Sequence, residues 1–198
     1  MTTIVTDGRT IVSDSLATTG NCFIDPSPLV KFIPYDDIVF AFAGTACLFK
    51  PLVEWYKKGA KPKEVPTVEE CESWLWVFQG NKLYEVSNAY PYPLEISAPS
   101  AMGSGRPYAT AALILGADPV LAVEAAIRCD PYSGGQVKIF ELPENLIVPI
   151  NPDFKPLITS LISIREGRRK GGEARAAKLS PERRAEIARG AAAKRWSK

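Results

Sequence analysis

The most informative absence in this chain of 198 residues is histidine, which does not occur at all. Without an imidazole there can be no Ser-His-Asp triad, no Cys-His pair and no zinc site that uses histidine. A hydrolase built from these residues therefore needs another base that titrates near neutral pH. The α-amino group, whose reference pKa is about 7.7–8.0, is the obvious candidate.

Long apolar runs and closely spaced cysteines are also lacking. No apolar run approaches the roughly 18 residues of a membrane-spanning helix, and the first residues show no signal-peptide pattern. The four cysteines include no Cys-x-x-Cys pair, which favours reduced thiols over a disulfide or zinc framework. We therefore expect a soluble, cytoplasmic protein with no membrane contact and no metal or cofactor.

The net charge of +2 is the sum of two regions of opposite sign. Residues 165–198 hold 12 Lys and Arg against 4 Asp and Glu, a net charge of +8, whereas residues 1–164 carry a net charge of −6. Prolines and glycines between positions 143 and 172 mark the boundary. The pattern predicts a domain over 1–142, a Pro-rich linker with an apolar segment over 143–164, and a basic tail over 165–198 that is partly helical or disordered.

Thr2 follows the initiator methionine directly. Methionine is usually removed when the next residue is small, so Thr2 would become the N-terminus without a propeptide. An N-terminal threonine carries its own base beside its hydroxyl, which is the pairing that activates such nucleophiles. Many chains begin with Met-Thr for no catalytic reason, so position alone does not assign this role.

Asp7-Gly8 lies between two β-branched runs and predicts a hairpin with a two-residue type I′ turn. Such a turn would pair Thr2 with Ser13. Asp14 would then lie one residue beyond the partner of Thr2, beside the free amine.

The rest of the domain reads as alternating strands and helices. Lys31 interrupts an apolar strand, so it either points to solvent or belongs to a site. Asp118-Pro119 is a helix start, with an N-cap and a proline in the first turn. The expected elements are hairpins over 29–42 and 74–86, helices over about 46–58, 107–115 and 118–130, and a strand over 137–142. This order indicates antiparallel sheets covered by helices.

Six motifs in order resemble the β-type subunits of the proteasome family, and most of all its bacterial HslV-type branch. They are Thr2-Thr3-Ile4-Val5, Ser13-Asp14-Ser15 with Ala17 to Asn21, Lys31, Phe42 to Ala46, Gly103-Ser104-Gly105 with Pro107-Tyr108-Ala109, and Arg128 to Gly135. The resemblance covers about residues 2–142. It implies an α+β fold, the αββα sandwich of N-terminal-nucleophile hydrolases, and a threonine-type endopeptidase.

The resemblance also implies a role for each matching residue. Thr2 would supply the nucleophilic hydroxyl and, through its α-amine, the general base. Lys31 would lie beside that hydroxyl, where its ammonium lowers the pKa of the α-amine. Asp14 would hold Lys31 in place. The Gly44 N–H would form the oxyanion hole, where glycine lets the substrate backbone approach.

The remaining matches concern the surroundings of Thr2. Ser104, Asp130 and Ser133 correspond to residues that orient the amine. Thr18 corresponds to a residue that pairs with extended substrate backbone. Phe42 would help line the pocket for the residue before the cut and suggests an apolar preference. Ordinary structural roles, such as a turn serine, a helix-end aspartate or a core phenylalanine, remain open for these positions.

Two features depart from the family pattern. Between Gly44 and Gly103 the family has two long helices, but here only one is convincing, so one outer helix is missing or shortened. The tail after 164 has no family counterpart; from Ser180-Pro181 onward it reads as an Ala- and Arg-rich helix that could bind nucleic acid or an acidic partner, although solvated basic tails are commoner.

The expected partners follow from the same reading. They are polypeptide substrates and further copies of the chain in a homo-oligomeric ring. Any ATP-dependent unfoldase would be a separate chain, because no phosphate-binding loop is present. Two alternatives stay open: an N-terminal-nucleophile amidase that acts on a small molecule, and a non-catalytic assembly subunit that works through its basic tail.

Overall fold

The computed structural model describes residues 2–19, 22–24, 30–68 and 71–157. Residues Met1–Pro156 form one compact unit. A second unit comprises Leu157–Lys198, and all but its first residue lie outside the described residues, as does the predicted basic tail.

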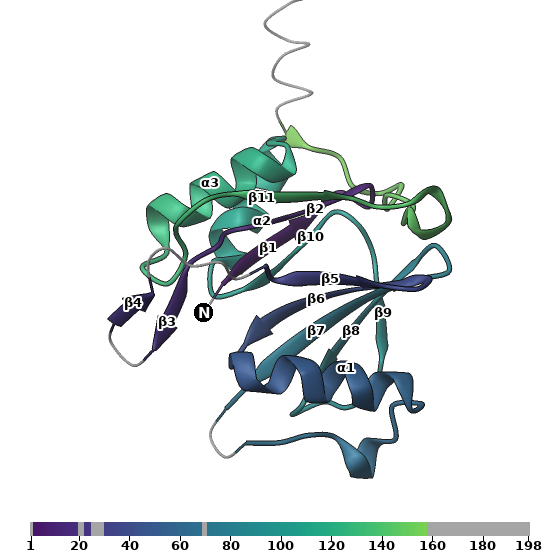
Figure 1. Ribbon diagram of the computed structural model, residues 1–198. Helices are drawn as coiled ribbons and strands as arrows, with labels where there is room; N and C mark the ends of the chain where they lie inside the picture. The colour runs from purple at the N-terminus through teal and green to yellow at the C-terminus, as the bar shows by residue number, and fades with distance from the viewer. Residues whose placement is uncertain (1, 20–21, 25–29, 69–70, 158–198) are drawn as a thin grey trace, which may run out of the picture. The chain divides into compact units, whose positions relative to one another are not determined.

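The first sheet has four antiparallel strands in the order β10-β1-β2-β11. Its strands are β1 (Thr3–Thr6), β2 (Thr10–Ser13), β10 (Ser100–Gly103) and β11 (Lys138–Glu141). Helices α2 (Arg106–Leu115) and α3 (Pro119–Cys129) cover one face of it (Figure 1). Asp118 caps α3 as predicted, because its carboxylate accepts a hydrogen bond from the Leu121 N–H at 2.9 Å.

The predicted two-residue turn in the first hairpin is wrong. The observed register pairs Ile4 with Ser13, two residues away from the expected pairing. The Asp7 carboxylate accepts hydrogen bonds from the N–H groups of Arg9 and Thr10 at 2.9 and 2.7 Å, which stabilises a longer connection. Side chains alternate between the two faces of a strand, so a shift of two residues leaves each side chain on its predicted face. The apolar residues of both strands therefore still point into the core.

The second sheet has five antiparallel strands in the order β5-β6-β7-β8-β9. These are β5 (Phe32–Tyr35), β6 (Ile38–Gly44), β7 (Ser73–Gln79), β8 (Lys82–Ser87) and β9 (Leu94–Ile96). The predicted Gly80-Asn81 turn is confirmed, since Gln79 pairs with Lys82 and both turn residues have positive φ. Helix α1 (Phe49–Lys57) follows a short 3-10 turn, Ala46–Leu48, and packs on this sheet (Figure 1).

Three apolar clusters define four layers. One lies between the sheets and includes Ile4, Ile11 and Trp76. The second joins the first sheet to α2 and α3, and the third joins the second sheet to α1. The predicted αββα sandwich is therefore confirmed.

The outer layer beside the second sheet is reduced, as expected. Among the described residues between Gly44 and Gly103, α1 is the only α-helix; a 3-10 turn, Pro62–Glu64, is the other helical element after it. No helix among the described residues is long and apolar enough to cross a bilayer. Strands β9 and β10 and the small hairpin of β3 (Ala17–Thr19) and β4 (Cys22–Ile24) were not predicted.

After β11, the chain up to Pro156 packs against the rest of the compact unit. Leu146 and Val148 are buried in the cluster between the sheets. The Val148 N–H donates to the Gly8 carbonyl at 2.8 Å, and the Asn151 N–H donates to the Ala98 carbonyl at 2.8 Å. The compact unit thus reaches Pro156 and includes the first part of the segment predicted as a linker.

Candidate active site

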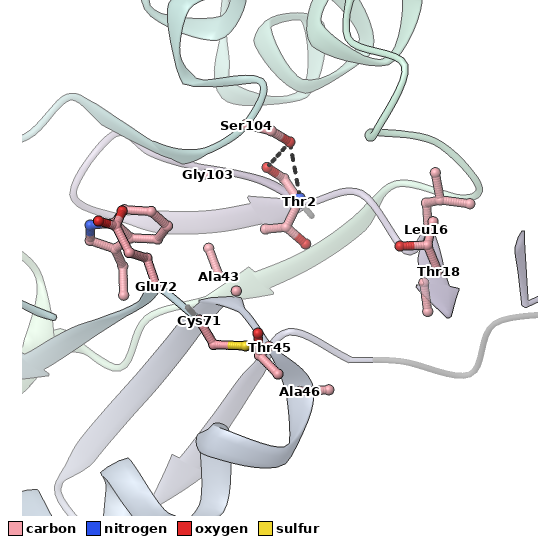
Figure 2. Close-up of a pocket in the computed structure, with 13 residues that line it drawn as sticks. Thr2, Leu16, Thr18, Ala43, Thr45, Ala46, Cys71, Glu72, Gly103 and Ser104 are labelled. Carbon is pink, nitrogen blue, oxygen red and sulfur yellow. Dashed lines mark hydrogen bonds between the residues drawn. The ribbon is translucent and has the colours of Figure 1, made fainter. Parts of the chain in front are cut away.

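A cleft of about 530 Å³ opens at the N-terminal end of β1. Thr2 lies in its wall, and Figure 2 shows the Thr2 side chain pointing into the cleft, away from Ser104. The Thr2 residue as a whole is only 3% exposed. None of the hydrogen bonds found among the described residues uses the Thr2 hydroxyl, so this oxygen faces whatever occupies the cleft.

Ser104 and Asp130 hold the backbone of Thr2. The Thr2 N–H donates to Ser104 Oγ at 3.2 Å, and the Ser104 hydroxyl donates to Asp130 Oδ2 at 2.7 Å (Figure 2 shows the Thr2–Ser104 contacts). Ser104 follows β10, whereas Asp130 is the residue that ends α3. The site therefore depends on the antiparallel pairing that sets Thr3 opposite Gly103.

Ser133 and Thr3 extend this network beneath the nucleophile. The Ser133 hydroxyl donates to Asp130 Oδ2 at 2.6 Å, and Ser133 Oγ lies 2.6 Å from Thr3 Oγ1. Since the proton of Ser133 is directed to the carboxylate, Thr3 is the donor of the second bond. Asp130, Ser133 and Thr3 are all buried, so these bonds fix the geometry with little competition from water.

A buried ion pair joins Lys31 to Asp14. Lys31 Nζ lies 2.7 Å from Asp14 Oδ1, and the two side chains are 2% and 0% exposed. Asp14 also accepts bonds from the N–H groups of Thr3, Leu16 and Gly134 at 2.8, 3.2 and 3.0 Å. This carboxylate therefore has a donor for each of its four lone-pair directions, which offsets the cost of burying the charge.

The pKa of Lys31 is lowered from its ordinary value. Desolvation of the ammonium by burial is the largest cause, and the attraction of Asp14, its hydrogen bond and the more distant charge of Asp130 oppose it. The sequence left open whether Lys31 points to solvent or belongs to a site. The structure shows that its side chain is buried beside Asp14.

The position expected for Asp14 needs one correction. The Asp14 carboxylate was expected beside the Thr2 amine, but it binds the N–H of Thr3, and the Asp14 N–H donates to the Thr3 carbonyl at 3.1 Å. The cause is the two-residue difference in hairpin register, which sets Asp14 opposite Thr3. The amide nitrogen of Thr2 instead faces Ser104.

The other predicted site residues lie on two cavities. Gly44 and Thr18 line the main cleft with Thr2. Gly44 has φ +132°, and a Cβ there would approach Ser73 Oγ to 2.5 Å, so no other residue fits. Phe42 does not line this cleft; it stacks on Phe49 with ring centroids 4.8 Å apart and borders a separate cavity of about 40 Å³ beside Lys31 and Gly44.

Several residues of the site have no role in the sequence-based prediction. Thr3 belongs to the network beneath the cleft, and strand alternation directs its side chain to the face opposite that of Thr2. In the lining of the cleft, the residues without a predicted role include Thr45, Cys71, Glu72 and Trp74. The available signal was weak: Glu72 and Trp74 stand two residues apart where a predicted strand begins, and only pairing with β6 brings them to Thr2.

Solved structures of other proteins have the same fold. Thiobacillus denitrificans BPH in complex with epoxomicin aligns with a TM-score of 0.54 and 21% identity over 75% of this chain and 99% of that one. HslV from Trypanosoma brucei aligns with a TM-score of 0.52 and 24% identity, over 71% and 99% of the two chains. A second structure of Thiobacillus denitrificans BPH gives 0.52 and 23%, over 77% and 99%.

No protein-family model matches the sequence, and no curated protein matches it significantly. The structural likeness covers nearly the whole length of each of these proteins and establishes the fold. The chain has the αββα fold of the HslV- and proteasome-type N-terminal-nucleophile hydrolases. Thr2 immediately precedes β1 and lines the cleft.

Proposed function

We propose that this protein is a threonine peptidase that hydrolyses peptide bonds with Thr2 as nucleophile. The observation that carries the proposal is that the residue after Thr2 is bound to a buried ion pair: Asp14 Oδ1 accepts a hydrogen bond from the Thr3 N–H at 2.8 Å and lies 2.7 Å from Lys31 Nζ. Burying two charged groups costs desolvation free energy. The chain contains no histidine, and this ion pair lies near the end of β1 that opens into the cleft.

The mechanism requires removal of Met1, which converts the Thr2 nitrogen into a free α-amine. That nitrogen already faces Ser104. The amine, directly or through one water, takes the proton of the Thr2 hydroxyl while the oxygen attacks the scissile carbonyl carbon. The Lys31 ammonium favours the developing alkoxide, and the Gly44 N–H stabilises the charge that forms on the carbonyl oxygen.

The reaction has two steps, acylation of Thr2 and hydrolysis of the acyl ester, and the α-amine carries the proton in both. The carbon–nitrogen bond breaks as the protonated α-amine returns its proton to the leaving amine, which leaves an acyl ester on Thr2. Water then attacks the ester carbon and gives its proton to the same amine. The acid product departs when the Thr2 oxygen recovers that proton, and the enzyme returns to its starting state.

The decisive experiment combines intact mass with covalent labelling. The active chain should begin at Thr2 and take up one equivalent of a peptide epoxyketone. Thr2→Ala should lose both labelling and turnover, with a fall in rate of more than about a thousandfold, while Thr2→Ser keeps part of each because it retains hydroxyl and amine. Thr110→Ala, a threonine on α2 outside the site, is the matched control.

Two results would overturn the proposal. One is a chain that keeps Met1 and still hydrolyses peptides; the other is full activity in Thr2→Ala. Labelling of Thr2 together with hydrolysis of small amides alone would favour the amidase alternative, and an unlabelled, inactive protein with Thr2 exposed would favour the assembly subunit.

A further inference from the structure

One wall of the cleft carries a charge that the proposed chemistry does not use. Glu72 immediately precedes β7, and Trp74 follows two residues later, so strand alternation directs both side chains to the same face. Trp74 pairs with Ala43 of β6. Ala43, Glu72 and Trp74 all line the cleft that contains Thr2.

Glu72 is exposed and unengaged. No hydrogen bond or ion pair found among the described residues involves its carboxylate, unlike the buried carboxylates of Asp14 and Asp130, each of which has several donors. Figure 2 shows Glu72 and Thr18 on opposite sides of Thr2. A peptide that lies along the cleft past Thr2 therefore meets a free carboxylate at one end.

The charge of the cleft is one-sided. Among the side chains of the 13 described residues that line it, only that of Glu72 carries a full charge. Behind the wall, the Lys31 ammonium is neutralised by Asp14, and Asp130 contributes a further negative charge that is held only by hydroxyl and N–H donors. A cationic side chain thus finds an attractive field there, and an anionic one is repelled.

We infer that Glu72 selects peptides with arginine or lysine at a position that adjoins the cleaved bond. This inference rests on the proposed peptidase function and adds its substrate class. Arginine is favoured over lysine, because a guanidinium can bind a carboxylate through two parallel hydrogen bonds and can stack on an aromatic face. The partly buried indole of Trp74 lies in the same wall and supplies that face.

The preference differs from the apolar one that Phe42 suggested. Phe42 is 6% exposed, stacks on Phe49 and borders the small cavity beside Lys31 and Gly44, so it does not line the cleft that contains Thr2. The wall that faces Thr2 instead consists of small residues together with Glu72 and Trp74. Size and charge of this wall favour a long side chain with a cationic tip.

The test uses quenched-fluorescence peptides that are identical except for arginine, lysine, leucine or glutamate at the two central positions, with the cut mapped by mass spectrometry. For the wild-type protein, kcat/KM should be about two- to fivefold higher with arginine than with leucine, and lowest with glutamate. Glu72→Gln should lower kcat/KM for the arginine peptide to about that for the leucine peptide and so remove the difference between the two. Raising the salt concentration to about 0.5 M should shrink the preference in the wild type.

Glu124→Gln is the matched control, because Glu124 is an exposed carboxylate on α3 outside the cleft. It should keep the full preference. Since Glu72 is exposed, its substitution should not disturb folding, and an unchanged midpoint of thermal unfolding verifies this. Charge reversal in Glu72→Lys should turn the preference toward the glutamate peptide.

The outcomes separate the two proposals. If Thr2 is labelled and peptides are cut, but leucine is as good as arginine or Glu72→Gln leaves the preference intact, the inference about Glu72 is wrong and the peptidase stands. If no peptide is cut and Thr2 takes up no label, both fall together.

Discussion

Lys31 and Asp14 form the buried ion pair of the site. Asp14 is fully buried and holds the ammonium at 2.7 Å, while its remaining lone pairs bind N–H groups from three segments of the chain. The ion pair is thus part of the backbone framework around Thr2. Its role differs from that of the exposed pairs, such as Lys61–Glu64 at 3.2 Å, which contribute little to stability.

We predict a bell-shaped dependence of kcat/KM on pH. The acidic limb reports deprotonation of the Thr2 α-amine, which must be neutral to act as base. The alkaline limb reports loss of the Lys31 ammonium, and it should lie below pH 10.5 because burial lowers the pKa of Lys31 from that ordinary value. Rates measured from about pH 6 to 11 check both limbs.

Asp14→Asn tests the sign of this effect. The Asp14 carboxylate raises the pKa of Lys31 by attraction and by its hydrogen bond, so its removal should lower that pKa further and move the alkaline limb to lower pH. Asp153→Asn, at an exposed acid outside the site, should leave the limb unchanged. An alkaline limb that moves upward in Asp14→Asn would contradict the assignment of this limb to Lys31.

At the scale of elements, the site depends on how closely the start of α2 approaches β1 and α3. Gly105 immediately precedes α2, and a Cβ there would overlap Thr3 Oγ1 and come within 2.9 Å of the Ala126 Cβ and 3.1 Å of Ser133 Oγ. Its φ is −80°, so the glycine is needed for space and not for backbone conformation. The close approach lets Thr3 and Ser133 form their hydrogen bond.

We predict that Gly105→Ala lowers the free energy of unfolding by about 1–3 kcal/mol, the usual cost of overpacking, and also reduces activity. Urea unfolding and peptide hydrolysis measure the two effects. In the double variant Thr3→Ala/Gly105→Ala the nearest clashing oxygen is gone, so part of the stability should return. Additive losses in the double variant would show that the alanine acts elsewhere.

The element scale also explains which predictions held. Local signals such as Gly80-Asn81 and Asp118-Pro119 predicted a turn and a helix start that the structure confirms, because the turn and cap residues there form their own hydrogen bonds and backbone conformations. At Asp7-Gly8 a similar signal failed. There the Asp7 carboxylate binds two N–H groups, and the Gly8 carbonyl accepts a bond from Val148, 140 residues later.

At the scale of the whole molecule, large apolar side chains remain exposed on the helical layer of the first sheet. Tyr108, Ile114 and Leu115 of α2 and Leu121 of α3 are 43–52% exposed. Burial of these side chains against a neighbouring subunit would remove apolar surface from water. A peptidase that acts on long chains also needs its nucleophile enclosed, and a closed ring of identical subunits provides such an enclosure.

We therefore predict a homo-oligomeric ring, stacked in pairs, as the active form. Native mass measurement at micromolar concentrations should give a closed set of subunits, and Leu121→Lys should shift the mass toward smaller species while the isolated fold is retained. A chain that stays monomeric and hydrolyses only small amides would contradict the prediction. The tail over 165–198 and its possible acidic or nucleic-acid partner lie outside the described residues and stay a prediction, as do the cytoplasmic location and a separate unfoldase.

The sequence by itself determined the chemical inventory of this protein. The absence of histidine, the threonine after Met1 and the strand and helix periodicities follow from residue identity and near neighbours. The αββα fold and the seven candidate catalytic residues were predicted from the resemblance of six ordered motifs to the proteasome family. Of these residues, Asp14, Lys31, Ser104, Asp130 and Ser133 are linked to Thr2 and Thr3 in one hydrogen-bond network, and Gly44 lines the cleft beside it.

Only the tertiary structure decided which groups touch. The partner of Asp14, the withdrawal of Phe42 into a stacked pair and the place of Glu72 opposite Thr18 depend on hairpin register and on the packing of two sheets. Residues that meet in the site are separated by up to 130 positions, as Thr3 and Ser133 are. Periodicity and turn signals act over a few residues, so contacts at that separation arise from the packing of whole layers.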